Sequence, residues 1–289
     1  MNDKIKITSE ILKDLGAGKN GIAEFERITG GVYEVEWGLD AQVELLKSDL
    51  RIWFGWLVKN KLIPSLDIEG VYLEGIDLTK VDLDNSKLTN VDLIMARLFK
   101  ANINYSYWNK VNLARADLRR STIYNSEWGE VDFTQSNLYV ASLGHSIFKN
   151  CNFCAANLES IFSDESYFID CNFTRANLEN ARSVHSNLIG SNFKGANLKG
   201  AFLGEVNLEG ADLTNADMAG VNLIGANLKG AILCRSNLEG AILYGANLEG
   251  ANLMCANLYK ANLELANLID VDLEDVNISG ANLRKSKFY

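Results

Sequence analysis

Residues 246–253, Ala-Asn-Leu-Glu-Gly-Ala-Asn-Leu, decide the fold, because they begin the same five-residue unit twice without a break. From Ile68 to Phe288, every residue whose number ends in 3 or 8 is large and apolar, except Ser163 and Ser183. The residue two places earlier is always Ala, Val, Ile, Leu, Ser or Cys. No insertion shifts this register, so residues 66–289 are expected to form one uninterrupted repeat domain.

The period of five residues matches neither an α-helix, at 3.6 residues per turn, nor a β-strand, at two. It fits a chain that turns a corner every five residues and points one large and one small side chain inward per side. Aromatic residues at the large positions recur at multiples of twenty in two sets, which predicts four sides per coil. The sets are Trp108, Trp128, Phe148, Phe168 and Phe288, and Phe133, Phe153, Phe173 and Phe193. A square rod of roughly eleven coils and ~54 Å follows at ~4.8 Å per coil.

The two exceptions fit this square geometry. Ser163 and Ser183 lie twenty residues apart, on the side opposite Phe153 and Phe173. Small side chains that face large ones keep the core volume constant.

The run Ala-(Asn/Asp)-Leu-x-Gly resembles the pentapeptide-repeat proteins, over about three quarters of the chain. This resemblance implies a mainly β fold, a right-handed quadrilateral parallel β-helix. The passage Leu45 to Ile68, with Trp53 and Trp56, is similar to the aromatic helix that leads into the repeats in bacterial members, the cyanobacterial type among them. Residues 1–65 are therefore expected to be a small α-helical domain that caps the open end of the solenoid.

The capping domain is expected to contain three helices. Ser9–Leu15 and Asn20–Ile28 are predicted to be short helices that end at glycines. Asp40 is a plausible N-cap of a longer helix that runs towards Lys61, with Leu46, Leu50 and Leu57 in its apolar stripe, and Pro64 stops it.

Composition limits the kind of protein. The 289 residues are 47% hydrophobic, which is typical of a globular chain, and no apolar run is long enough to span a membrane. The net charge of −9 disfavours direct binding to nucleic acid or to anionic lipid. Five cysteines without scaffold spacing indicate reduced thiols, and hence a cytoplasmic protein.

Motifs for catalysis are weak. Residues 16–19, Gly-Ala-Gly-Lys, lack the spacing and the hydroxyl residue of a phosphate loop, so we interpret them as a turn between helices. Cys151 and Cys154 form one C-x-x-C, but the register points Cys151 inward beside Cys171 and favours core packing. A convex rod offers no enclosed site. The sequence predicts no enzyme, no cofactor and no metal site.

One side of the predicted rod carries unusual outward residues. The only two histidines of the chain lie at the same position of different coils, and two glutamates share that position. Beside them, bulky or charged residues replace the usual Asn, Glu or Gly. The candidate partner-binding patch consists of His145, Phe162, Asp164, Glu165, Arg182, His185, Phe202 and Glu205. Exposed aromatic residues beside charges are typical of recognition surfaces. The alternative is a local bulge at Ser163 and Ser183 that turns Phe162 inward.

Two functions are compatible with such a rod. The first is a non-enzymatic scaffold or regulator that presents its sides to a protein partner. The second follows from the resemblance, because some family members mimic duplex DNA and protect DNA gyrase. DNA mimicry fits poorly with the Lys and Arg residues that are interleaved with the acidic ones, and with the unbroken register of the repeat. Either protein could be a monomer or a homodimer joined end to end at its C-terminal coil, where Phe288 lies.

Overall fold

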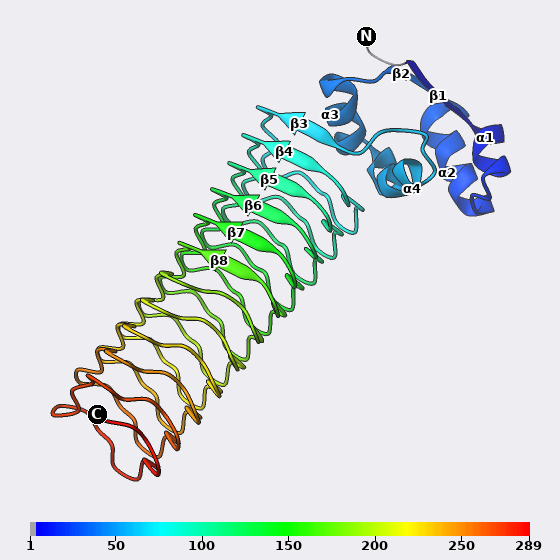
Figure 1. Cartoon of the computed structure of the whole chain (residues 1–289). Coiled ribbons are helices and arrows are strands. Elements are labelled where there is room, and N and C mark those ends of the chain that lie inside the picture. Colours follow the sequence, from blue (N-terminus) through cyan, green and yellow to red (C-terminus); the bar gives the residue numbers. More distant parts are fainter. Residues whose placement is uncertain (1–3) are drawn as a thin grey trace.

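The five-residue register closes into a rod because backbone groups pair from coil to coil. In the computed structural model, which describes residues 4–289, parallel bridges join residues twenty positions apart, from Tyr72 and Asp92 to Asn267 and Lys287. A typical contact is the Leu228 N–H, which donates to the Asn247 carbonyl at 2.7 Å. The expectation of a parallel, mainly β solenoid is confirmed (Figure 1).

Regular strand is confined to one side of the first part of the rod. Six short strands pair in parallel in chain order: β3 (Asp67–Glu69), β4 (Lys87–Thr89), β5 (Tyr107–Asn109), β6 (Glu127–Gly129), β7 (Ile147–Lys149) and β8 (Tyr167–Ile169). These six strands cover about five turns of the solenoid, whereas the sequence predicted roughly eleven coils. The other sides, and the rest of the chain, are joined by isolated bridges, because a corner every five residues leaves no room for longer strands.

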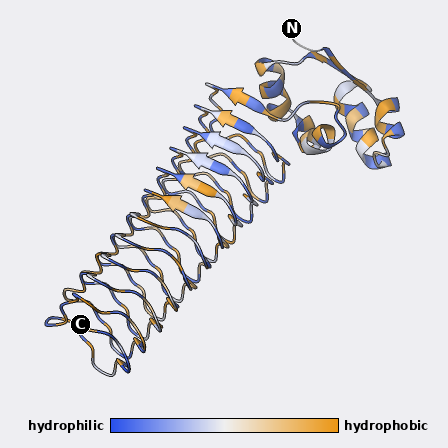
Figure 2. Ribbon diagram, in the orientation of Figure 1, coloured by the Kyte–Doolittle hydropathy of each residue, from blue (hydrophilic) through white to orange (hydrophobic). Residues whose placement is uncertain are grey.

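We number the sides by the coil 161–180: side 1 is 161–165, side 2 is 166–170, side 3 is 171–175 and side 4 is 176–180. Residues twenty positions before or after belong to the same side. Strands β3 to β8 lie on side 2. Figure 2 shows hydrophobic and hydrophilic residues alternating along the coils, as expected when each unit points two side chains inward and three outward.

From Gly70 to Asp270, each side ends in a corner residue with left-handed backbone. Gly230 has φ 63°, a conformation that glycine adopts at little cost. However, every corner from Lys80 to His185 is a residue other than glycine, and all have positive φ. Left-handed backbone costs an L-residue roughly 1–2 kcal/mol. The first half of the rod therefore carries more of this strain than the second half, where glycine occupies many of the corners.

Stacked aromatic rings fill the middle of the core. The rings of Phe153 and Phe173 are almost parallel, with centroids 4.9 Å apart, and Phe193 continues the stack at 4.7 Å. Trp108 and Trp128 pack against each other on side 2, with ring centroids 4.6 Å apart and an angle of 46° between the rings. The two aromatic columns predicted from the twenty-residue spacing are thus confirmed.

The N-terminal unit contains two strands besides its helices. Its elements are β1 (Lys4–Thr8), α1 (Ser9–Asp14), α2 (Lys19–Thr29), β2 (Val32–Glu36), α3 (Leu39–Lys47), the 3₁₀ helix η1 (Asp49–Trp53) and α4 (Phe54–Lys59). Strands β1 and β2 pair antiparallel and were not predicted. Within residues 4–289, no helix has the length and hydrophobicity needed to cross a membrane.

The long helix predicted from Asp40 towards Lys61 is wrong. Helix α3 begins after Gly38, and the chain leaves helical geometry at Ser48, where ψ is 169°. The Ser48 hydroxyl donates to the Leu45 carbonyl at 2.8 Å and accepts the Leu50 N–H at 3.2 Å. Serine competes with the helical backbone in this way, so the stripe of apolar residues is divided among three short helices.

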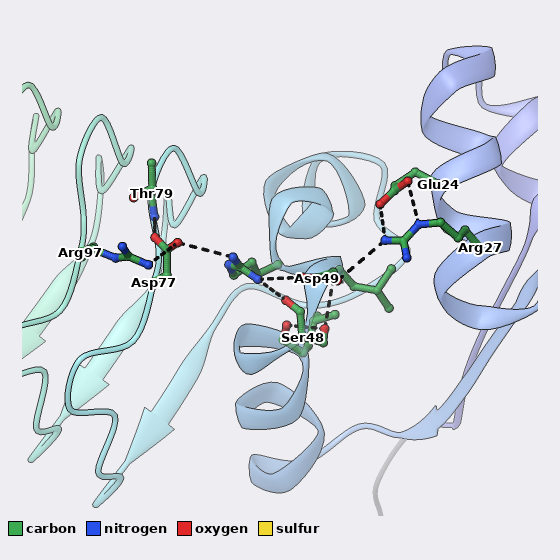
Figure 3. Close-up of polar contacts among 10 residues, drawn as sticks. Glu24, Arg27, Ser48, Asp49, Asp77, Thr79 and Arg97 are labelled. Carbon is green, nitrogen blue, oxygen red and sulfur yellow. Dashed lines mark hydrogen bonds and ion pairs between the residues drawn. The ribbon is translucent and has the colours of Figure 1, made fainter.

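The N-terminal unit is fastened to the first coils by polar contacts. The buried Gln42 accepts the Asp67 N–H at 2.8 Å. A chain of ion pairs runs from Arg27 through Asp49 and Arg51 to Asp77, where Arg51 lies 3.6 Å from the carboxylate (Figure 3).

Asp77 joins this chain to the solenoid. Its carboxylate also pairs with Arg97 at 3.0 Å (Figure 3). Burial raises the pKa of Asp77, but hydrogen bonds from Thr79 and the charges of Arg97 and Arg51 outweigh it and lower the pKa below its usual value. The ionised carboxylate therefore stabilises the junction.

Candidate functional site

All eight residues of the candidate patch lie on side 1, over four successive coils. His145 belongs to the first of these coils, Phe162 to the second, Arg182 to the third and Phe202 to the fourth. The patch therefore extends along the rod rather than around it.

Phe162 points outward and Ser163 points into the core. The exposed fraction of Phe162 is 45%, against 1% for Ser163. The backbone register is unbroken here, since the Phe162 N–H donates to the Ala141 carbonyl at 3.0 Å. The Ser163 and Ser183 hydroxyls lie 3.1 Å apart, so the buried polar groups satisfy each other. The alternative of a bulge that turns Phe162 inward is wrong.

Phe162, Arg182 and Phe202 form an aromatic–cation–aromatic column. Parallel bridges place them at the same position of consecutive coils. The Arg182 guanidinium lies 5.6 Å from the centre of the Phe162 ring, in cation–π contact. Phe202 is 49% exposed. Two phenyl groups thus stand out of the rod on either side of a charged group.

Asp164 holds Arg182 in this position. Its Oδ2 accepts the Arg182 Nε–H at 2.8 Å, and its Oδ1 accepts the Val184 N–H at the same distance. One carboxylate thereby fixes both the backbone of the next coil and the orientation of the guanidinium. The column is preorganised, which lowers the entropy cost of binding.

The histidines and glutamates occupy the neighbouring corner. His145 Nδ1 lies 3.4 Å from Glu165 Oε2, and His185 Nδ1 lies 3.3 Å from Glu205 Oε2. Among residues 4–289, no ion pair joins Glu165 to His185. The single column of histidines and glutamates that the spacing predicted therefore consists of two separate pairs.

Further aromatic and aliphatic residues extend side 1 in both directions. Tyr124 packs edge-on against His145, with ring centres 4.8 Å apart, and lies over Gly144, where any side chain would be crowded. Ile224 and Ile242 are also exposed on this side, and sequence reasoning missed both. Ile242 takes the place of the usual Asn, as Phe162 and Phe202 do, so the signal was present.

The other candidate motifs occupy the core and a turn between helices. Cys151 and Cys171 are buried, as predicted, and their thiols lie against the carbonyls of Trp128 and Phe148. Burial raises the pKa of the Cys171 thiol far above its usual value, which makes it a poor nucleophile. Residues 16–18 form the turn between α1 and α2, and Lys19 begins α2. In the described chain, no group of three His, Cys, Asp or Glu residues is arranged to hold a metal ion.

The repeated unit matches a known family. Copies of the pattern "Pentapeptide repeats" cover residues 67–104, 166–204, 203–240, 235–268 and 251–288, which together make up more than half of the chain. The chain belongs to the pentapeptide-repeat family. No curated protein matches the sequence of this family member.

Solved pentapeptide-repeat structures are similar to it over most of their lengths. HetL, involved in heterocyst differentiation regulation in the cyanobacterium Nostoc sp. strain PCC 7120, is 28% identical over 79% of this chain and 95% of its own, with a TM-score of 0.30. QnrB1, a plasmid-mediated fluoroquinolone resistance protein, is 16% identical over 77% and 91%, with a TM-score of 0.33. Rfr23 from the cyanobacterium Cyanothece 51142 is 26% identical over 48% and 90%, with a TM-score of 0.15.

Proposed function

We propose that this pentapeptide-repeat protein is a non-enzymatic scaffold that binds a protein partner through side 1. The observation that carries the proposal is the exposed Phe162–Arg182–Phe202 column. Aromatic residues and arginine contribute most of the energy at protein interfaces, and Asp164 already holds the arginine in place. The outward surface of the rod is convex, which suits contact with a protein better than enclosure of a small substrate.

A double substitution tests the site. Phe162→Ala with Phe202→Ala removes both exposed rings and leaves the core unchanged. The matched control is Tyr107→Ala with Tyr167→Ala, because these tyrosines are 45% and 49% exposed on side 2, equal to the two phenylalanines on side 1.

Quantitative affinity capture compares the wild-type protein with the two variants. A partner of side 1 is recovered by the wild type and the tyrosine control and is lost with the phenylalanine variant. Its affinity, measured by calorimetry with purified proteins, should fall at least about thirtyfold for each of the two rings that is an interface hot spot, since a hot spot is worth about 2 kcal/mol or more. Equal recovery with both variants would remove the basis of the proposal.

The second candidate function is mimicry of duplex DNA towards DNA gyrase, which the net charge of −9 favours. A gyrase supercoiling assay with the purified protein, with and without a quinolone, distinguishes the two functions. Inhibition or protection would favour mimicry and place the site on the acidic surface. Unchanged supercoiling would leave the protein scaffold as the function.

A further inference from the structure

Three basic residues stack at one corner of the rod, between side 4 and side 1. Lys80, Lys100 and Arg120 occupy the same position in three consecutive coils, and the backbone bonds there are continuous, with the Lys80 N–H donating to the Phe99 carbonyl at 2.8 Å. We call these three residues the basic corner. At ~4.8 Å per coil, three like charges lie along ~10 Å of the rod.

The charges of the basic corner are not neutralised within the described chain. Among residues 4–289, none of the three has a carboxylate within ion-pair distance, and all three are exposed. Several cations elsewhere on the rod do have such partners: Lys194 lies 2.8 Å from Asp212, and Lys229 lies 2.8 Å from Glu249. Stacked like charges repel each other and reduce the stability of the fold.

The backbone at this corner is also strained. Lys80, Lys100 and Arg120 have φ of 60°, 58° and 59°. Four later coils place glycine at the same corner, at Gly200, Gly220, Gly240 and Gly280, where left-handed backbone costs little, while Lys260 keeps a basic residue there with φ 56°. Long basic side chains therefore stand at this corner against both backbone preference and mutual repulsion. The same backbone occurs at every corner from Lys80 to His185, so what distinguishes this corner is the run of three cations.

Apolar residues adjoin the basic corner on side 4. The Phe99 ring lies under the Lys100 ammonium at 5.4 Å and near the Arg119 guanidinium at 5.6 Å. In the coil that follows Arg120, Tyr139 and Val140 are exposed, and Val140 occupies the same position as the three basic residues. A ligand of this surface would thus meet positive charge at one end and apolar groups at the other.

We propose that the basic corner binds a short acidic segment of a partner protein, one that carries several carboxylates and at least one large apolar side chain. An extended chain advances ~3.3 Å per residue, so three or four residues span the three charges. A longer polyanion such as nucleic acid is disfavoured, because the remaining surface of the rod is acidic and would repel it. This surface is separate from the aromatic column on side 1.

The test uses a fluorescent peptide with alternating Glu and Leu residues as the probe and the full chain as the receptor. Fluorescence anisotropy gives the affinity for the wild type and for Lys80→Gln, Lys100→Gln, Arg120→Gln combined. The matched control is Lys194→Gln, Lys199→Gln, Lys229→Gln, which makes the same change in net charge at cations that already have partners. Thermal unfolding monitors the folding of each variant, and Lys100→Gln alone replaces the triple variant if that one unfolds.

We expect the peptide to bind the triple variant about tenfold more weakly, since each exposed ion pair contributes a few-fold. The control triple should change the affinity by less than about twofold, and the side 1 variant of Phe162 and Phe202 should not change it. Equal losses in the two lysine and arginine triples would overturn the proposal. Tighter binding of a single-stranded oligonucleotide than of the peptide at physiological salt would overturn it as well.

Discussion

The core of the rod has spare room at Ser163 and Ser183, which leads to a prediction about stability. A small void of about 10 Å³ is lined there by both serines together with Phe173 and Phe193. The preceding coil encloses Leu143 at the same position, together with two phenylalanines, and all of these are fully buried. The coil of Ser183 holds only one phenylalanine. With a leucine at position 183, the side chains in the core of this coil would therefore occupy no more volume than those in the coil of Leu143.

We expect Ser183→Leu to increase the free energy of unfolding by about 1 kcal/mol. A fully buried leucine side chain contributes about 1.5–3 kcal/mol. Loss of the hydrogen bond to Ser163 takes away about 1 kcal/mol, and an imperfect fit takes part of the remainder. Ser163 retains an acceptor, because the Arg182 carbonyl lies 3.3 Å from its hydroxyl.

Urea unfolding, followed by far-ultraviolet circular dichroism and by tryptophan fluorescence, measures the change. The slope of the free energy of unfolding against urea concentration must be the same in the variants and the wild type, because arrays of repeats can lose two-state behaviour. Ser183→Ala is the matched control, since it removes the hydroxyl without filling the void, and it should lower the stability by up to about 1 kcal/mol. A leucine variant less stable than the alanine variant would show that the core has no room and would refute the reasoning.

Three further predictions concern stability. Phe173→Ala should lower the free energy of unfolding in urea by about 3–5 kcal/mol, because the ring is enclosed in the aromatic stack. Phe162→Ala should lower it by less than about 0.5 kcal/mol, because that ring is exposed. Similar losses in the two variants would contradict the register. Val140→Gly should raise the stability by about 1 kcal/mol, since this exposed β-branched residue has φ 58°, and a lower unfolding midpoint would argue against strain there. Asp77→Asn should be less stable than the wild type near neutral pH. Because the pKa of Asp77 is lowered in the folded protein, its carboxylate stabilises the fold fully above the unfolded pKa of about 3.9, and this stabilisation is lost as pH falls through the folded pKa. The unfolding curves of the two proteins should therefore converge in acid. A difference in stability that stays constant with pH would exclude the carboxylate as the cause.

Local helix signals were less reliable than the repeat. The apolar stripe through Leu46, Leu50 and Leu57 predicted one helix, but Ser48 interrupts it with bonds to its own backbone. Spacing alone does not show whether such a serine will point to solvent or compete with the helix. Strands β1 and β2 escaped prediction because each is short and gains its stability only by pairing with the other.

The five-residue period by itself determined the solenoid, its four sides and the residues of its core. Each unit repeats the same local geometry, and stacking of coils leaves no other arrangement that buries the large residues at every fifth position. The period also placed the candidate residues on one side. Only the tertiary structure decided what they do there: that Phe162 faces solvent, that Asp164 fixes Arg182, and that His145 and His185 belong to separate pairs. These outcomes depend on side-chain torsions and on contacts between coils twenty residues apart, which a periodic pattern does not encode.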